Sequence, residues 1–123
     1  GEYITLFSSD DIMKPNRVEE LYLALVDKDD SYAIAIGDAE FIDDNGMSIG
    51  MTDSGEYCLP DQGYNRFLEF FTRRREDTKQ VKNIFDYDLL IKGNYIPSMS
   101  VVMRKKAIDD LGRYNPDIAL EDW

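Results

Sequence analysis

Two neighbouring carboxylates, Asp10 and Asp11, stand between a short apolar run at residues 3–7 and Pro15, a residue suited to the first position of a helix. They therefore fall where a buried strand ends and a helix is about to begin, which is where open α/β sheets place ligands. Side-by-side carboxylates repel each other, and a divalent cation relieves that repulsion. A solvated loop and a metal site explain the pair equally well when it is considered alone.

Adjacent aspartates recur along the chain, so position decides what each pair means. The other three pairs are explained by local structure alone. Asp29-Asp30 close a predicted helix, Asp43-Asp44 build a turn, and Asp109-Asp110 lie on the solvated face of a short helix. The pair at the end of the first apolar run is the one that sits at a ligand-binding position.

The composition is that of one folded, soluble domain. The chain has 123 residues with 43% hydrophobic and 12% aromatic content, and 14 basic against 25 acidic residues give a net charge of −11. This charge disfavours nucleic-acid phosphates and anionic lipid headgroups as general partners. The single cysteine, Cys58, cannot form an internal disulfide, which fits a reducing compartment. We expect a cytoplasmic location, with the inner face of the membrane as an alternative for the full-length protein.

The first half of the chain predicts a strand, a helix and a second strand. Residues 3–7 and 32–36 have the mostly apolar composition of strands covered on both faces. The intervening helix begins at Pro15, with acidic residues in its first turn and an apolar stripe formed by Val18, Leu21, Tyr22, Leu25 and Val26. A crossover through a helix makes the two strands parallel.

The second half predicts a hairpin, two helices and one more strand. The turn signal at residues 43–46 separates residues 41–42 from 47–51, and residues 52–62 are predicted to form a loop. Helices are expected over residues 64–74 and 105–111, the latter stopped by Gly112. A strand over residues 98–103 is expected to join those at 3–7 and 32–36 in one central sheet of an α/β fold.

Three segments in this order resemble a known enzyme family. The segments "GEYITLFSSDDIMKPNRVEEL", "YAIAIGDAEFIDDNG" and "NYIPSMSVVMRKKAIDDLGRYNPDIALEDW" are similar to the middle and later parts of the inverting nucleotide-sugar glycosyltransferases of glycosyltransferase family 2. The resemblance covers almost the entire chain and lacks diagnostic motifs only over residues 52–93. It implies a three-layer, Rossmann-like GT-A mixed sheet with flanking helices, of which residues 1–123 form a single partial domain without the N-terminal nucleoside-binding strands.

The resemblance assigns a metal role to the first acidic motif. Asp10 falls on the carboxylate that binds Mn²⁺ or Mg²⁺ bridging the sugar-nucleotide diphosphate, and Ser9 beside it is expected to contact the substrate. The first acidic position of the motif is Ser8 here, so fewer protein charges hold the ion and the diphosphate supplies more of its ligands. Asp11 is a second ligand, a partner of the ligand, or a cap for the following helix.

The resemblance places the catalytic base at the other end of the chain. Glu121, Asp122 and Trp123 match the family's second acidic motif, in which the aspartate is the base, so Asp122 is the candidate catalytic residue and its neighbours are candidate substrate contacts. A sugar hydroxyl is a poor nucleophile, and losing its proton during attack on the anomeric carbon lowers the barrier. A carboxylate favoured by a helix N-terminus is the structural alternative for Asp122. Ser98 falls where family members line the site near the transferred sugar.

The implied function is transfer of a sugar, with inversion, from a nucleoside-diphosphate donor to a saccharide or lipid-linked acceptor in polysaccharide biosynthesis. Gly1 and Trp123 look like cut ends, so we expect a fragment that is inactive alone and that dimerises or aggregates. The alternatives are a non-catalytic acidic α/β interaction domain and a magnesium-dependent phosphoryl-transfer or receiver domain. A receiver domain needs a lysine and a hydroxyl at later strand ends, places that Lys92 and Ser98 do not fill well.

Overall fold

The computed structural model describes residues 1–73, 87–91, 93 and 95–112 of the chain. The chain divides into two compact units. We call Gly1–Gly37 with Ser98–Trp123 the sheet unit, and Asp38–Pro97 the hairpin unit.

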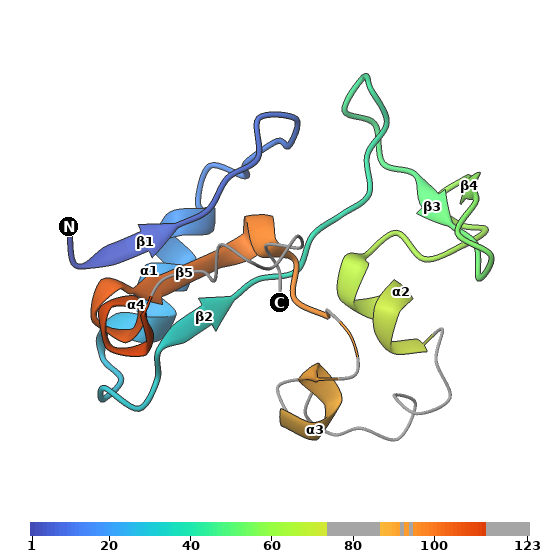
Figure 1. Ribbon diagram of the computed structural model, residues 1–123. Helices are drawn as coiled ribbons and strands as arrows, with labels where there is room; N and C mark the ends of the chain where they lie inside the picture. Colours follow the sequence, from blue (N-terminus) through green and yellow to red (C-terminus); the bar gives the residue numbers. More distant parts are fainter. Residues whose placement is uncertain (74–86, 92, 94, 113–123) are drawn as a thin grey trace. The chain divides into compact units, whose positions relative to one another are not determined.

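The sheet unit contains a three-stranded sheet in the order β1-β5-β2, formed by β1 (Tyr3–Thr5), β5 (Val101–Arg104) and β2 (Ile34–Ile36). The central strand β5 is antiparallel to both neighbours, so β1 and β2 are parallel to each other (Figure 1). This confirms that the three predicted segments share one sheet and that the first two are parallel. The two parallel strands are not neighbours, because β5 lies between them.

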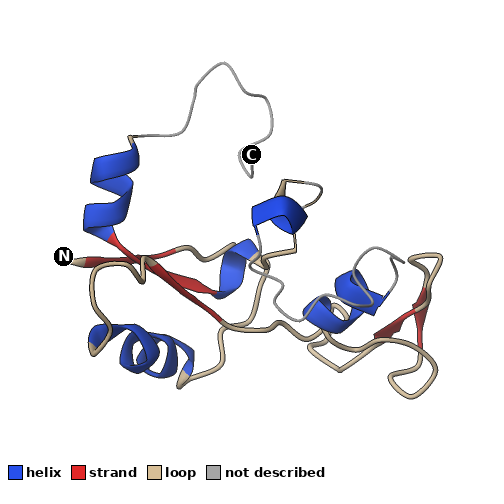
Figure 2. Cartoon of the chain, turned by 90° about the horizontal axis from the view of Figure 1, so that it is seen from below, coloured by secondary structure: helices blue, strands red, loops and turns tan. Residues whose placement is uncertain are grey.

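Helix α1 (Arg17–Val26) covers one face of this sheet. Leu21 and Leu25 pack on Val102 of the central strand, with Tyr3 and Ala35 at the border of the cluster. Leu25 and Val102 are 1% and 2% exposed, and full burial of such a side chain contributes about 2 kcal/mol to folding. The helix that follows the central strand, α4 (Lys105–Leu111), lies on the other side of the sheet from α1 (Figures 1 and 2).

The start of α1 was predicted wrongly. The helix begins at Arg17 instead of Pro15, because the N–H of Arg17 closes a turn onto the carbonyl of Lys14 at 3.1 Å. Asn16 occupies the N-cap position. Of the predicted apolar stripe, Leu21 and Leu25 are buried, whereas Val18 and Tyr22 are 40% and 38% exposed, so the buried stripe is narrower than the sequence pattern.

The strands are also shorter than predicted. β1 ends at Thr5, and the next carbonyl, that of Leu6, accepts a hydrogen bond from the Arg17 side chain. The segment predicted as a strand from residue 98 begins with a 3₁₀ turn, η1 (Ser98–Ser100), and only Val101–Arg104 is extended. The stop of α4 is as predicted: Gly112 has a φ of 92°, which favours glycine, and its N–H donates to the carbonyl of Ile108.

The hairpin unit contains β3 (Gly50–Met51), β4 (Tyr57–Cys58), α2 (Phe67–Arg73) and α3 (Tyr87–Leu90). The predicted turn is confirmed: the N–H of Asp43 donates to Met47 and residues 42 and 48 form a bridge. The prediction of an irregular loop over residues 52–62 was wrong, because β4 lies within it and pairs antiparallel with β3. A turn whose Gly55 has a φ of 85° joins the two strands.

Aromatic side chains form the core of the hairpin unit. Phe70 on α2 is 3% exposed and meets the ring of Phe41 at 5.9 Å and that of Phe71 at 5.0 Å, both edge-on. Helix α2 starts three residues later than predicted because Tyr64 exchanges both main-chain hydrogen bonds with Met51, which holds the chain extended there. None of the helices in the described residues is long and apolar enough to span a bilayer.

Candidate functional site

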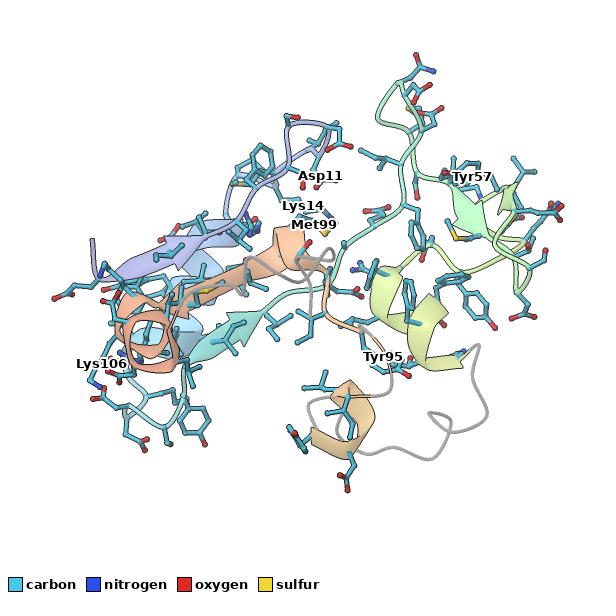
Figure 3. The ribbon with its side chains drawn as sticks, in the orientation of Figure 1. Asp11, Lys14, Tyr57, Tyr95, Met99 and Lys106 are labelled. Carbon is cyan, nitrogen blue, oxygen red and sulfur yellow. The ribbon has the colours of Figure 1, made fainter. Side chains whose placement is uncertain are left out.

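Three segments meet at one end of the sheet unit. Pairing of Thr5 with Val102 and of Ile36 with Val101 places the carboxyl ends of β1 and β2 beside the start of β5. Figure 3 shows Asp11, Lys14 and Met99 at this end of the sheet, with Lys106 at the opposite end. We call the segment of residues 6–11, together with Arg17 and η1, the candidate site.

The acidic pair lies on an exposed turn within this site. The N–H of Asp11 donates to the carbonyl of Ser8 at 3.4 Å, which closes the turn that carries both aspartates. Asp10 and Ser9 are exposed, and Asp11 is half-buried. The carboxylate of Asp10 is therefore accessible to a ligand from solvent. Asp11 is not the helix cap that was one of its three predicted roles, since Asn16 holds that position.

Arg17 connects this segment to the sheet. Its Nη2 donates to the carbonyl of Leu6 and to that of Val101, both at 3.2 Å, and to the hydroxyl of Thr5 at 3.0 Å. The Thr5 hydroxyl in turn donates to the Val101 carbonyl at 2.7 Å. One guanidinium nitrogen thus ties the end of β1 to the start of β5, immediately before the acidic turn.

The charge on Arg17 is partly removed from water. Its Nε and Nη1 are buried and make no hydrogen bond in the structure. Burial lowers the pKa of Arg17 from its ordinary value, while the negative charge of Asp11 acts in the opposite direction. An arginine stays protonated under these conditions, so the site holds a fixed positive charge behind its acidic turn.

Sequence reasoning missed Arg17, although a signal was present. The first turn of a helix favours acidic residues because of the helix dipole, and Glu19 and Glu20 follow that rule. A basic residue at the first helical position goes against it. Such a departure from local preference indicates that the side chain is needed for a contact elsewhere.

The end of β2 and the start of β5 approach each other very closely. The N–H of Gly37 donates to the carbonyl of Ser100 at 2.8 Å, and Ser100 is 6% exposed. Ser98, two residues earlier, is half-buried in η1. The structure therefore brings Ser98 to the same end of the sheet as Asp10 and Asp11. The remaining predicted site residues, Glu121, Asp122 and Trp123, lie outside the described residues.

The donor set fits a metal ion that arrives with its substrate. Within the described residues, no group of three or more His, Cys, Asp or Glu side chains could hold a metal ion. Mg²⁺ is commonly bound through one or two carboxylates, with substrate phosphates and water completing its shell. Asp10, with Asp11 beside it, supplies that number of carboxylates and would hold such an ion.

Comparisons of the chain with protein-family models, with curated proteins and with solved structures found no match. The functional interpretation therefore rests on the residues of the site and on the sequence resemblance described above.

Proposed function

We propose that the protein is an inverting, metal-dependent glycosyltransferase that moves a sugar from a nucleoside-diphosphate donor to an acceptor hydroxyl. The observation that carries the proposal is the position of Asp10 and Asp11, on an exposed turn after β1, at the end of the sheet where β2 also ends and β5 begins. Open α/β sheets bind ligands at this edge. The edge also brings together residues of the first and third of the three segments that resemble the glycosyltransferase family.

Two carboxylates have distinct roles in the proposed reaction. Asp10 would hold Mn²⁺ or Mg²⁺ together with the donor diphosphate, and such an ion would supply positive charge for the leaving group. Asp122 accepts the proton of the attacking hydroxyl. Attack from the face opposite the diphosphate inverts the anomeric configuration. Ser9, Ser98, Glu121 and Trp123 are the proposed substrate contacts.

The proposed acceptor is a saccharide or a lipid-linked saccharide, and the proposed location is the cytoplasm or the inner face of the membrane. Nucleic-acid phosphates are not expected to bind this chain in general. The carboxylates at the site are exposed and the net charge is −11, so the phosphates are repelled.

A thermal-shift screen tests the proposal. The natural protein that contains this sequence is heated with a panel of nucleoside-diphosphate sugars, with and without Mn²⁺, beside its Asp10→Asn variant as the matched control. We expect one donor to raise the midpoint by about 5 °C only when Mn²⁺ is present, because a ligand that binds the native state stabilises it. The variant should show no Mn²⁺-dependent rise.

No shift with any donor would contradict the proposal and favour the non-catalytic interaction domain. A shift of equal size in wild type and Asp10→Asn would show that the donor binds elsewhere, and the assignment of the metal site would be wrong.

A further inference from the structure

Arg17 makes an unusual set of contacts for a residue at the start of a helix. A single nitrogen, Nη2, serves two carbonyls and one hydroxyl, while Nε and Nη1 are buried and unpaired. Leaving buried N–H groups without partners is costly, even on a side chain that is only partly buried as a whole. Packing alone therefore does not explain why the side chain is inserted at this place.

The segment after β1 needs a restraint from outside itself. Its own backbone contact, from Asp11 to Ser8, is long at 3.4 Å. Adjacent negative charges on Asp10 and Asp11 repel each other and favour an open turn. The negative charge of Asp11 raises the pKa of Arg17 against the larger effect of burial, so the two charges attract each other.

A second arginine of the sheet unit provides a comparison. Arg104 also bridges elements through main-chain carbonyls, donating from Nε to Tyr32 at 3.0 Å and from Nη2 to Leu25 at 2.9 Å. Its Nη1 donates to the hydroxyl of Tyr3 at 3.2 Å, so every side-chain nitrogen is used. Arg104 closes the opposite end of the sheet and touches no residue of the candidate site.

We propose that Arg17 is a positioning residue, which anchors residues 6–11 to the start of β5 and so holds Asp10 and Asp11 toward the bound cation and diphosphate. The anchoring follows from the contacts of Arg17, whereas the role of the anchored segment rests on the proposed function. Arg17 touches the main chain on both sides of the join between β1 and β5, at the carbonyls of Leu6 and Val101. The hydroxyl of Thr5, to which Arg17 also donates, reaches the same two carbonyls at 3.5 and 2.7 Å.

The test compares Arg17→Gln, Arg17→Lys and the matched control Arg104→Gln in two measurements. The first is the backbone order parameter of residues 7–11 by ¹⁵N relaxation. The second is the affinity for the Mn²⁺–pyrophosphate complex, measured by equilibrium dialysis, which separates the complex bound to protein from the complex in solution. The glutamine variant removes both the charge and the guanidinium fork, whereas lysine keeps the charge alone.

We expect wild-type order parameters of about 0.8 over residues 7–11, falling below about 0.6 in Arg17→Gln. The same variant should bind Mn²⁺ with pyrophosphate about tenfold more weakly, because a charge-assisted anchor is lost. In both measurements, Arg17→Lys should give values between those of wild type and Arg17→Gln. Arg104→Gln should match wild type in both measurements, although its global stability falls. If Arg17→Gln does not fold, the lysine variant carries the comparison.

Unchanged order parameters in Arg17→Gln, or an equal loss in Arg104→Gln, would overturn the proposal, because Arg17 would then be an ordinary stabilising contact. The two hypotheses fail separately. Wild-type protein that binds no Mn²⁺ with pyrophosphate would contradict the proposed function, while the order parameters would still decide whether Arg17 anchors the segment.

Discussion

Gly37 and Ser100 are in such close contact that the structure leaves no space for a side chain at position 37. A Cβ atom placed there would lie 2.6 Å from the hydroxyl oxygen of Ser100, while the main chains of the two residues are joined by a hydrogen bond of 2.8 Å. This contact fixes the end of β2 against the start of β5, next to the candidate site.

Substitution of Gly37 by Ala should destabilise the protein by about 1–3 kcal/mol, because overpacking of a tight contact forces its neighbours to move. Urea unfolding monitored by circular dichroism measures the loss. Ser100→Ala removes the clashing oxygen, so the double variant should lose less than the sum of the single variants. An alanine variant with the wild-type midpoint would show that the contact relaxes without cost.

Asp38 is expected to stabilise the first turn of α2. Its Oδ1 accepts hydrogen bonds from the N–H of Ala39 at 2.9 Å and from that of Leu68 at 3.0 Å. Asp38→Ala should lower stability by about 1 kcal/mol, the usual cost of losing a side-chain cap, and Asp38→Asn should lower it less. Native-state hydrogen exchange at Phe70 reports the loss locally. Unchanged exchange in the alanine variant would refute this capping role.

The turn at Asp43 should be sensitive to acid. Hydrogen bonds from the N–H of Met47 and, to a smaller extent, of Asn45 lower the pKa of Asp43 below the ordinary value of 3.8. Because the folded pKa is depressed, the stabilisation is present above the ordinary pKa and is lost as the pH falls through the folded value. A carboxyl titration followed by NMR should therefore give a midpoint below 3.8 for Asp43. A midpoint at or above that value would contradict the turn geometry.

Local signals in the sequence predicted much of the fold. Gly112 ended its helix where expected, and the turn at residues 43–46 formed because Asp43 and Gly46, with a φ of 77°, are suited to it. The three apolar segments 3–7, 32–36 and 98–103 entered one sheet as expected. The expectation that the first two are covered on both faces was wrong, because Phe7 and Ile34 are 50% and 41% exposed.

What the sequence did not predict depends on contacts between distant residues. The insertion of β5 between β1 and β2 pairs Tyr3 with Arg104, and no local pattern encodes that choice of partner. The contact of Arg17 with Val101 spans 84 residues. Ser98 was predicted to lie near the site only because of the family resemblance. Composition and periodicity carry no information on which distant residues come together.

Replacing Asp10 by Asn should abolish sugar transfer in the natural protein that contains this sequence and leave its folding intact. Asp10 is exposed on a turn, so the substitution removes a charged ligand without disturbing the core. Urea unfolding of the variant should give the wild-type midpoint. A large drop in that midpoint would show that Asp10 has a structural role.

The most direct measurement of the central claim is the release of nucleoside diphosphate from a donor sugar in the presence of a saccharide acceptor, across a Mn²⁺ titration, in the natural protein that contains this sequence and in its Asp10→Asn variant. The account predicts that release by wild type rises with Mn²⁺ and saturates, and that the variant is slower by at least about 100-fold at every concentration, because charge on the leaving diphosphate is no longer balanced. Equal rates of the two proteins across the titration would contradict the assignment of Asp10 to the metal, and no release by wild type at any Mn²⁺ concentration would contradict the proposed glycosyltransferase.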